Sequence, residues 1–225
     1  MHRVQKLLSN YGYCSRRKAE ELIQQGKVKV NDKIITIGDQ AEETDKIYVE
    51  NKLVNKQKKI YLMFNKPLNC VTALTDKQYK TVMDYIKVKE RIFPIGRLDY
   101  NTSGLLLLTN DGDFANSIMH PRYEINKTYS VNIDKPIKEN HINQIEKGIQ
   151  LKDGLTSPAK INVINPKKIE ITIHEGKNRI VRRIFNKLEY EIISLKRVKI
   201  GKLELNLAIG QYKDLTEQDK KLIFS

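Results

Sequence analysis

The residues of this sequence that are best suited to chemistry surround Asp99, in the run from Gly96 to Gly112. Residues 105–108 are four leucines, a run too short for a typical helix, which predicts a strand buried on both faces. Residues 101–104 carry short polar side chains and end in a glycine, which predicts a turn. A carboxylate beside that turn lies partly out of water and needs a cation to stay ionised. Capping of the turn is the commoner role for an aspartate in this position, and catalysis is the alternative.

The elements around Asp99 must bring its carboxylate to the end of a strand. Residues 92–98 are apolar and β-tolerant, so we expect a strand that ends just before it. Arg97 lies two residues away, on the same face if the strand extends that far. Residues 110–112 predict a second turn after the leucines. The order is therefore strand, turn, strand and turn.

The whole run from Gly96 to Gly112 resembles the signature of the RsuA/RluB family of pseudouridine synthases. In that family Gly-Arg-Leu-Asp, two variable residues, Ser or Thr, Gly and a leucine run carry the catalytic aspartate, and the match here has no gap. The resemblance implies that Asp99 acts at the ribose of a uridine flipped out of its stack. It leaves open whether the carboxylate attacks C1′ as a nucleophile or acts at C2′ as a base.

Two further stretches are similar to motifs of the same family. Asn65-Lys66-Pro67 matches its entry motif, and Lys127-Thr128-Tyr129 matches the motif that carries its active-site tyrosine. The resemblance implies that Tyr129 is catalytic and forms an aromatic wall for the flipped base. Taken alone, a strand tyrosine is more often a core residue with its hydroxyl at the rim.

Residues 175–183 resemble the last motif of the family. A Gln commonly stands there where this chain has Ile180, so one polar contact of the motif is missing. The resemblance implies that Arg182 is catalytic, as the cation that keeps Asp99 charged in a dry pocket. The neighbouring Arg183 is expected to reach RNA phosphate instead.

The chain from residue 59 onward alternates short strands and helices, which indicates an α+β domain with a mixed, mainly antiparallel sheet flanked by helices. We expect strands at 60–64, 127–133, 159–164, 168–174 and 194–201. We expect helices at 113–119, 138–147, 179–187 and from a Thr216 cap to 223, with a short helix or turn at 81–86. In the first of these helices Phe114, Ile118 and Met119 should face inward.

Residues 3–50 predict a small module of two helices and a hairpin. Ser15 is a good N-cap for a helix over 16–25, and Gly26 ends it. Residues 28–35 predict a hairpin around Asn31-Asp32. The run from Ser15 to Asn31 resembles the αL-type RNA-binding module first described in a ribosomal small-subunit protein. With residues 51–59 as a linker, we expect domains at 1–58 and 59–225.

The formal net charge of +14 predicts a polyanionic partner. Compositional drift toward Lys, Ile and Asn would also add lysines, but it would not place arginines in pairs at Arg16-Arg17 and Arg182-Arg183. Guanidinium groups grip phosphate bidentately, so RNA or DNA is favoured. The residues expected to contact RNA are Arg3, Arg16, Arg17, Lys27, Lys29, Lys66, Arg97, Arg122, Lys127, Lys177, Arg179, Arg183, Lys196 and Arg197.

Several classes of protein do not fit the composition. Two distant cysteines and four scattered histidines give no disulfide framework and no metal-ligand spacing, so we expect no metal, no cofactor and a reducing, cytoplasmic compartment. A helical pattern begins directly after Met1, and no apolar run is long enough for a membrane span, so we expect neither a signal peptide nor a membrane partner. A two-metal nuclease using Asp99 with Asp111 or Asp113 is disfavoured, because the apolar strand between them holds the carboxylates apart.

The sequence therefore predicts an enzyme, acting as a monomer, that isomerises a uridine of ribosomal RNA or of a ribosome-assembly intermediate. Residues 116–122 and 148–154 look more like the large-subunit branch of the family than the small-subunit branch. A non-catalytic RNA-binding or ribosome-assembly protein that keeps the same fold is the alternative.

Overall fold

The computed structural model describes residues 1–225, and the chain forms two compact units. The first unit contains residues 1–61, 88–93 and 108–114, and the second contains residues 62–87, 94–107 and 115–225. The first unit thus includes two segments that lie beyond residue 58. The expected domain boundary at that residue stays a prediction.

The first unit contains the helix pair and the hairpin that the sequence predicts. Its helices are α1 (Val4–Asn10) and α2 (Arg16–Gln24), and its strands are β1 (His2–Arg3), β2 (Val28–Val30), β3 (Lys33–Ile34), β4 (Gln40–Ala41), β5 (Ile47–Val49) and β6 (Lys52–Leu53). As expected, the Ser15 side chain caps α2 by accepting a hydrogen bond from the backbone N–H of Lys18. Both helices and strands β2 and β5 bury apolar side chains in one shared core.

The predicted linker begins later than expected, because β6 pairs with β5. Glu50 and Asn51 connect the two strands with φ values of 48° and 63°. Two consecutive residues in the left-handed region are typical of a tight two-residue hairpin. Since glutamate rarely adopts that conformation, the sequence pattern did not reveal this hairpin.

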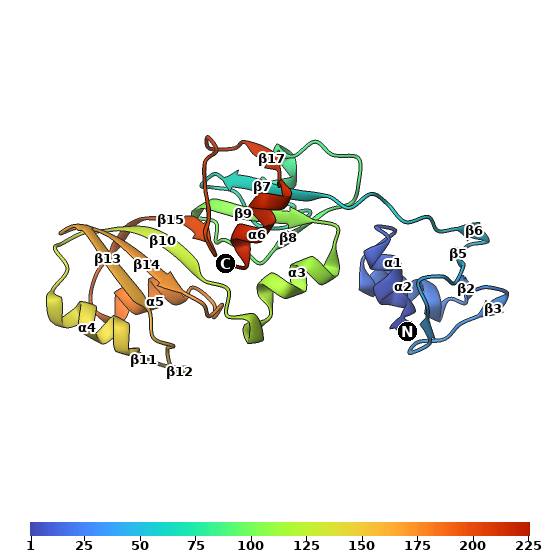
Figure 1. Ribbon diagram of the computed structural model, residues 1–225, viewed down its shortest axis with the longest axis horizontal. Coiled ribbons are helices and arrows are strands. Elements are labelled where there is room, and N and C mark those ends of the chain that lie inside the picture. Colours follow the sequence, from blue (N-terminus) through green and yellow to red (C-terminus); the bar gives the residue numbers. More distant parts are fainter. The chain divides into compact units, whose positions relative to one another are not determined.

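The larger sheet has nine strands in the order β13-β14-β10-β15-β9-β7-β17, with β16 beside β15 and β8 beside β9 (Figure 1). These strands are β7 (Tyr61–Lys66), β8 (Phe93–Ile95), β9 (Ser103–Thr109), β10 (Lys127–Ile133), β13 (Lys160–Asn165), β14 (Lys168–Ile173), β15 (Ile192–Ile200), β16 (Leu203–Glu204) and β17 (Tyr212–Asp214). The pairs along β13-β14-β10-β15 are antiparallel, as are β15/β16 and β7/β17, whereas β9 and β15 are parallel. The prediction of a mixed, mainly antiparallel sheet is confirmed.

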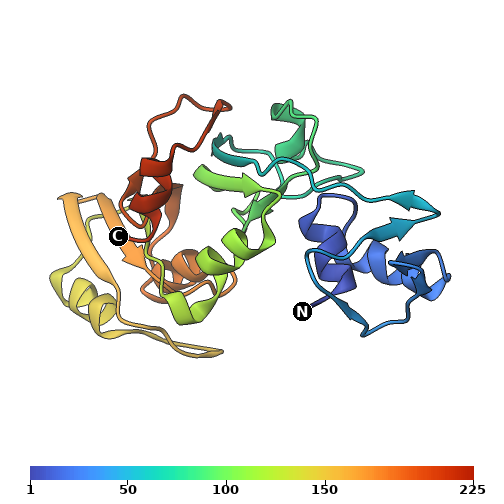
Figure 2. The same ribbon diagram turned by 45° about the vertical axis from the view of Figure 1, so that its right-hand side comes forward.

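Helices α4 and α5 cover one face of this sheet (Figure 1 and Figure 2). The helices are α3 (Gly112–Met119), α4 (Glu139–Lys147), α5 (Ile180–Lys187) and α6 (Glu217–Ile223), with 3-10 turns η1 (Val82–Tyr85) and η2 (Pro121–Tyr123) and a small hairpin of β11 (Gln150–Leu151) and β12 (Gly154–Leu155). The apolar stripe of α5, Ile180 and Ile184 with Val181 and Phe185 beside it, packs on Val131 of β10 in one core cluster. None of the helices combines the length and apolar character that a membrane span requires.

Two local predictions near the signature run are wrong. The strand expected over 92–98 is limited to β8, because Gly96 turns the chain away with a φ of +71°. Met119, expected to face inward, is 48% exposed because it is the last residue of α3, where its Sδ accepts a hydrogen bond from the Gly96 N–H.

Strand β9 contains the four leucines, and all of them are completely buried, as predicted. Its parallel pairing to β15 joins Ser103 to Lys196 and Gly104 to Arg197. At Gly104, with a φ of +109°, a Cβ atom would lie only 2.2 Å from the carbonyl oxygen of Arg197. Only glycine therefore allows the turn before β9 to approach β15 this closely.

Candidate active site

A cavity of about 860 Å³ lies beside the turn that precedes β9. This volume is in the range of sites that enclose a small molecule or a single nucleotide. Its lining comes from residues 95–99, 118–121, 124–125, 127, 129, 157, 174–182, 195, 197 and 200. The cavity is therefore formed by the Asp99 turn, the segment around η2, strands β10 and β15, and the start of α5.

Asp99 lines this cavity from the turn between β8 and β9, and its side chain is partly exposed. The turn is closed by a hydrogen bond of 3.0 Å from the backbone N–H of Thr102 to the Asp99 carbonyl oxygen. The Asp99 carboxylate itself makes no hydrogen bond and no ion pair. It is thus positioned through its backbone and left free toward the cavity.

Lys66 lies under this turn and is completely buried. Its Nζ donates hydrogen bonds to the carbonyl oxygens of Pro67, Asp99 and Thr102 at 3.0, 3.1 and 3.0 Å. Burial lowers the pKa of Lys66 to about 8, although the nearby Cys70 and Asp99 act in the opposite direction. This placement contradicts the prediction that Lys66 contacts RNA, because its amine instead holds the Asp99 turn on the end of β7.

Arg182 leaves α5 toward the same turn but forms no ion pair with Asp99. One of its terminal nitrogens donates to the Asn101 carbonyl oxygen at 2.6 Å and to the Thr102 hydroxyl at 3.4 Å. Burial and the charge of Arg179 lower the pKa of Arg182, while the Asp99 carboxylate raises it. The expected direct pairing is therefore absent, because the guanidinium is bonded to the turn two residues beyond Asp99.

Tyr129 lies on β10, in the strand that the alternating pattern predicts, and lines the cavity. It pairs in register with Ile171 of β14 and Arg197 of β15, and its ring is partly buried against the same core cluster as Val131 and Ile133. Tyr129 therefore combines a core contact on one side with a cavity wall on the other.

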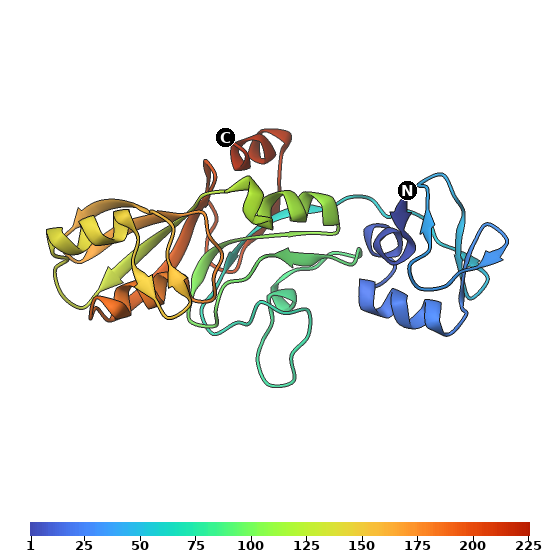
Figure 3. The same cartoon turned by 90° about the horizontal axis from the view of Figure 1, so that it is seen from below.

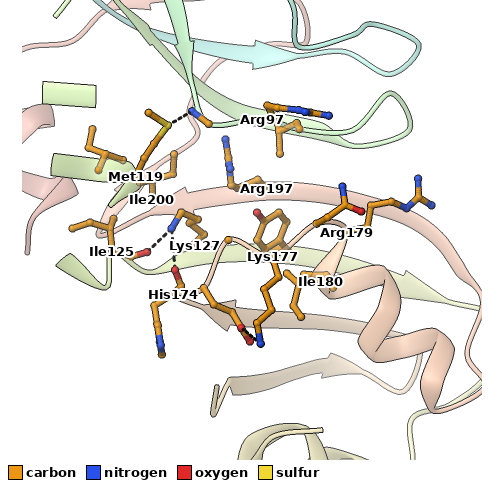
Figure 4. A pocket seen from close by; sticks show the side chains of 18 of the residues that line it. Arg97, Met119, Ile125, Lys127, His174, Lys177, Arg179, Ile180, Arg197 and Ile200 are labelled. Atoms are coloured by element: carbon orange, nitrogen blue, oxygen red, sulfur yellow. Dashed lines mark hydrogen bonds and ion pairs between the residues drawn. The ribbon is translucent and has the colours of Figure 1, made fainter. Parts of the chain in front are cut away.

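Lys127 and Arg197 also line the cavity and lie between its two walls (Figure 4). Arg197 is 3% exposed, and its Nε donates to the Leu105 carbonyl oxygen at 2.7 Å. Lys127 donates to the carbonyl oxygens of Ile125 and His174 at 2.9 and 3.2 Å. Burial, with a smaller effect of Arg197, lowers the pKa of Lys127 to about 8. Both side chains face the cavity rather than the outer surface, and their contact with RNA stays a prediction.

The other residues predicted to contact RNA fall into two groups. Some are at least partly exposed and form no salt bridge with a carboxylate: Arg3, Arg16, Arg17, Arg97, Arg122, Arg179 and Lys196. Others already have a partner, namely Lys27 with Glu50, Lys29 with Asn51, Lys177 with Glu175, and Arg183 with Asp153. Arg122 also lies over the Tyr123 ring, 4.5 Å from its centroid.

The sequence alone did not reveal Glu175 as a site residue. Its carboxylate accepts a hydrogen bond of 2.9 Å from the Ser157 N–H and pairs with Lys177 Nζ at 3.1 Å, both at the cavity wall. Glu175 begins the motif over residues 175–183, but its bond to Ser157 joins residues 18 positions apart and has no local sign in the sequence. No three His, Cys, Asp or Glu side chains of the chain lie close enough together to hold a metal ion.

Residues 60–187 match the family model described as RNA pseudouridylate synthase, which covers more than half of the chain. The chain belongs to this family. Residues 2–47 of the synthase match the S4 domain model, so the small module before the catalytic part is an S4 domain and RNA is the partner.

The synthase is similar over nearly its full length to proteins of the same family. It is 45% identical to "Ribosomal large subunit pseudouridine synthase B" of Bacillus subtilis (strain 168), over 98% of this chain and 95% of that protein. It is 34% identical to "Dual-specificity RNA pseudouridine synthase RluF" of Escherichia coli (strain K12), over 96% of this chain and 76% of that protein. A solved pseudouridylate synthase superimposes with a TM-score of 0.74 at 32% identity, covering 99% of this chain and all of that one. The predicted fold class and enzyme class are therefore confirmed.

Proposed function

We propose that this synthase isomerises a uridine of ribosomal RNA, with the large-subunit rRNA as its substrate. The support for the catalytic part is the free carboxylate of Asp99, which faces the cavity from a turn anchored by Lys66. The support for the substrate is the 45% identity to a synthase named for the large ribosomal subunit. The enzyme acts in the cytoplasm as a monomer and uses no metal or cofactor.

The reaction needs one ionised carboxylate and no external reactant. The bond between ribose C1′ and uracil N1 breaks, the base turns, and a bond forms between C1′ and C5, whose proton is transferred so that N1 ends protonated. Asp99 takes part either by bonding to C1′ or by taking a proton from C2′, and it is regenerated at the end. The cavity of about 860 Å³ has room for the released base beside the ribose.

Two cavity residues support Asp99 in this step. Arg182 holds the Asn101 carbonyl oxygen and places positive charge near the Asp99 carboxylate. Tyr129 presents its ring at the cavity wall, where a flipped uracil needs a stacking partner to replace its neighbours in the RNA. The S4 domain supplies phosphate contacts through exposed arginines such as Arg16 and Arg17.

The test is to map pseudouridine in the small-subunit and large-subunit rRNAs from a strain that lacks this gene and from the same strain with the gene restored. We expect a large-subunit uridine to lose its modification and the wild-type gene to restore it. Asp99→Asn should bind the same rRNA and restore nothing, because the amide is neither the needed nucleophile nor the needed base. A site lost only from small-subunit rRNA would contradict the substrate, and full restoration by Asp99→Asn would contradict the catalytic assignment.

A further inference from the structure

The segment between β7 and η1 projects from the sheet as a long loop (Figure 3). Tyr79 on this loop is 44% exposed, and Tyr100, the residue after Asp99, is 37% exposed. Their rings meet edge to face with centroids 5.1 Å apart. One of these partly exposed rings therefore belongs to the residue next to Asp99, the other packs against it, and neither lines the cavity.

The loop holds Tyr79 in place through its own hydrogen bonds. The Asp76 carboxylate accepts hydrogen bonds of 2.9 Å from the backbone N–H groups of Gln78 and Tyr79. Val71 binds the Lys80 carbonyl oxygen at 2.9 Å and closes the base of the loop. Because these bonds fix the backbone on both sides of the ring, little further entropy is lost when a partner binds it.

The Asp99 turn and this loop are also joined to each other. The Asn69 N–H donates to the Tyr100 carbonyl oxygen at 3.0 Å. The Thr72 hydroxyl donates to the Leu98 carbonyl oxygen at 2.7 Å and accepts from the Leu98 N–H at 3.2 Å. Tyr79 and Tyr100 thus form a preformed surface fixed to the turn that carries Asp99.

We propose that Tyr79 and Tyr100 form a stacking platform for an RNA base next to the target uridine. When the uridine is flipped into the cavity, the bases that flank it lose a stacking partner. Aromatic side chains replace that contact without regard to base identity, because every base has a π-face. The exposed Lys77 and Lys80, which form no salt bridge, place positive charge beside the rings for the phosphates of the same strand.

The absence of tryptophan from this chain provides a direct test. Tyr79→Trp and Tyr100→Trp each introduce a single reporter and keep an aromatic ring, and Ile164→Trp on the exposed edge strand β13 is the control. With large-subunit rRNA from the deletion strain, we expect stacking to quench the emission of the first two proteins only. Equal quenching in all three, or none in the first two while RNA is bound, would overturn the platform.

The second measurement is RNA affinity, taken from the enzyme concentration that gives half of the maximal single-turnover rate on the same rRNA. Tyr79→Ala and Tyr100→Ala should each weaken RNA affinity by roughly five- to a hundredfold, the range expected for one lost base stack. Tyr79→Phe and Tyr100→Phe should retain affinity, and the salt dependence should be unchanged in all four because no phosphate contact is lost. Wild-type affinity in the alanine variants, or a shallower salt dependence, would contradict the proposal.

The platform rests on the proposed rRNA modification, and the two can fail separately. If wild-type protein makes no pseudouridine in this rRNA while the tryptophan reporters are still quenched, the proposed substrate is wrong, whereas the finding that these rings stack on RNA bases stands. If quenching occurs with a ribosome-assembly particle but not with its protein-free rRNA, the rings bind a protein and the platform proposal is wrong.

Discussion

At the scale of single residues, the protein fixes the backbone around Asp99 and leaves its carboxylate without a hydrogen bond. Lys66 and Thr102 bind the Asp99 carbonyl oxygen, and Arg182 binds that of Asn101. A carboxylate that already had a tight partner would have to break that contact before it reached the ribose. The arrangement therefore keeps the reacting group in position and available.

Arg182→Met should reduce the rate of the chemical step by roughly a hundred- to a thousandfold, the size typical of one lost electrostatic contact in a dry site. The loss removes both the bond to the Asn101 carbonyl oxygen and the positive charge near Asp99. The matched control is Arg183→Met, because Arg183 pairs with Asp153 away from this turn. Single-turnover rates at saturating enzyme provide the comparison, and equal losses in the two variants would show that the wrong arginine was chosen.

Lys66 should make the free energy of unfolding depend on pH in the range between its pKa in the folded protein and its ordinary pKa. Its pKa of about 8 in the folded protein lies below the ordinary value of 10.5, so folding releases a proton between these limits. The contribution of Lys66 to the free energy of unfolding is thus fully present above pH 10.5 and is lost as the pH falls toward 8. We expect the difference in this free energy between wild type and Lys66→Met to grow over that window, measured by denaturant unfolding. Parallel pH curves would contradict the depressed pKa.

At the scale of elements, the contact of β9 with β15 depends on Gly104. Gly104→Ala introduces strain of about 1–3 kcal/mol from its positive φ and a clash with β15 that adds roughly 1–3 kcal/mol. Gly154→Ala is the matched control, because its φ of +112° is nearly the same and a Cβ there meets nothing within 4 Å. Denaturant midpoints should show a larger loss of stability for Gly104→Ala than for Gly154→Ala. Equal losses would mean that β9 and β15 can move apart without cost.

The elements that the sequence predicts are those whose signals are local. Ser15 before an amphipathic stretch marks α2, and the leucines of β9 mark a strand buried on both faces. The missed features depend on distant partners. The buried positions of Lys66 and Arg197 depend on carbonyl oxygens that lie 33 and 92 residues away. A lysine or arginine in a motif carries no local sign of whether its charge faces solvent or a carbonyl group. The family motifs correctly predict that Asp99, Tyr129 and Arg182 line one cavity, but not the bonds that Arg182 makes.

At the scale of the whole molecule, the net charge of +14 should make RNA binding strongly salt-dependent. Arg16 and Arg17 are exposed on the first turn of α2 and form no salt bridge. Replacing both with Gln should make the slope of log affinity against log salt shallower by about 1.4 to 1.8, the counterion release of two phosphate contacts. Lys27→Gln is the control, because Lys27 is paired with Glu50. A slope that is unchanged in the double variant would exclude these arginines from the RNA interface.

The parallel pairing of β9 with β15 also has a consequence for how the chain is made. Arg197, which binds the Leu105 carbonyl oxygen, is synthesised 92 residues later. At synthesis rates of about 5 to 20 residues per second this delay is roughly 5 to 20 seconds. During that interval the nascent chain carries the four leucines of β9 with no β15 beside them, and the turn that bears Asp99 lacks Arg182. The protein therefore becomes an enzyme only after β15 has been made, and its leucine strand is the segment that a ribosome-associated chaperone would have to protect until then.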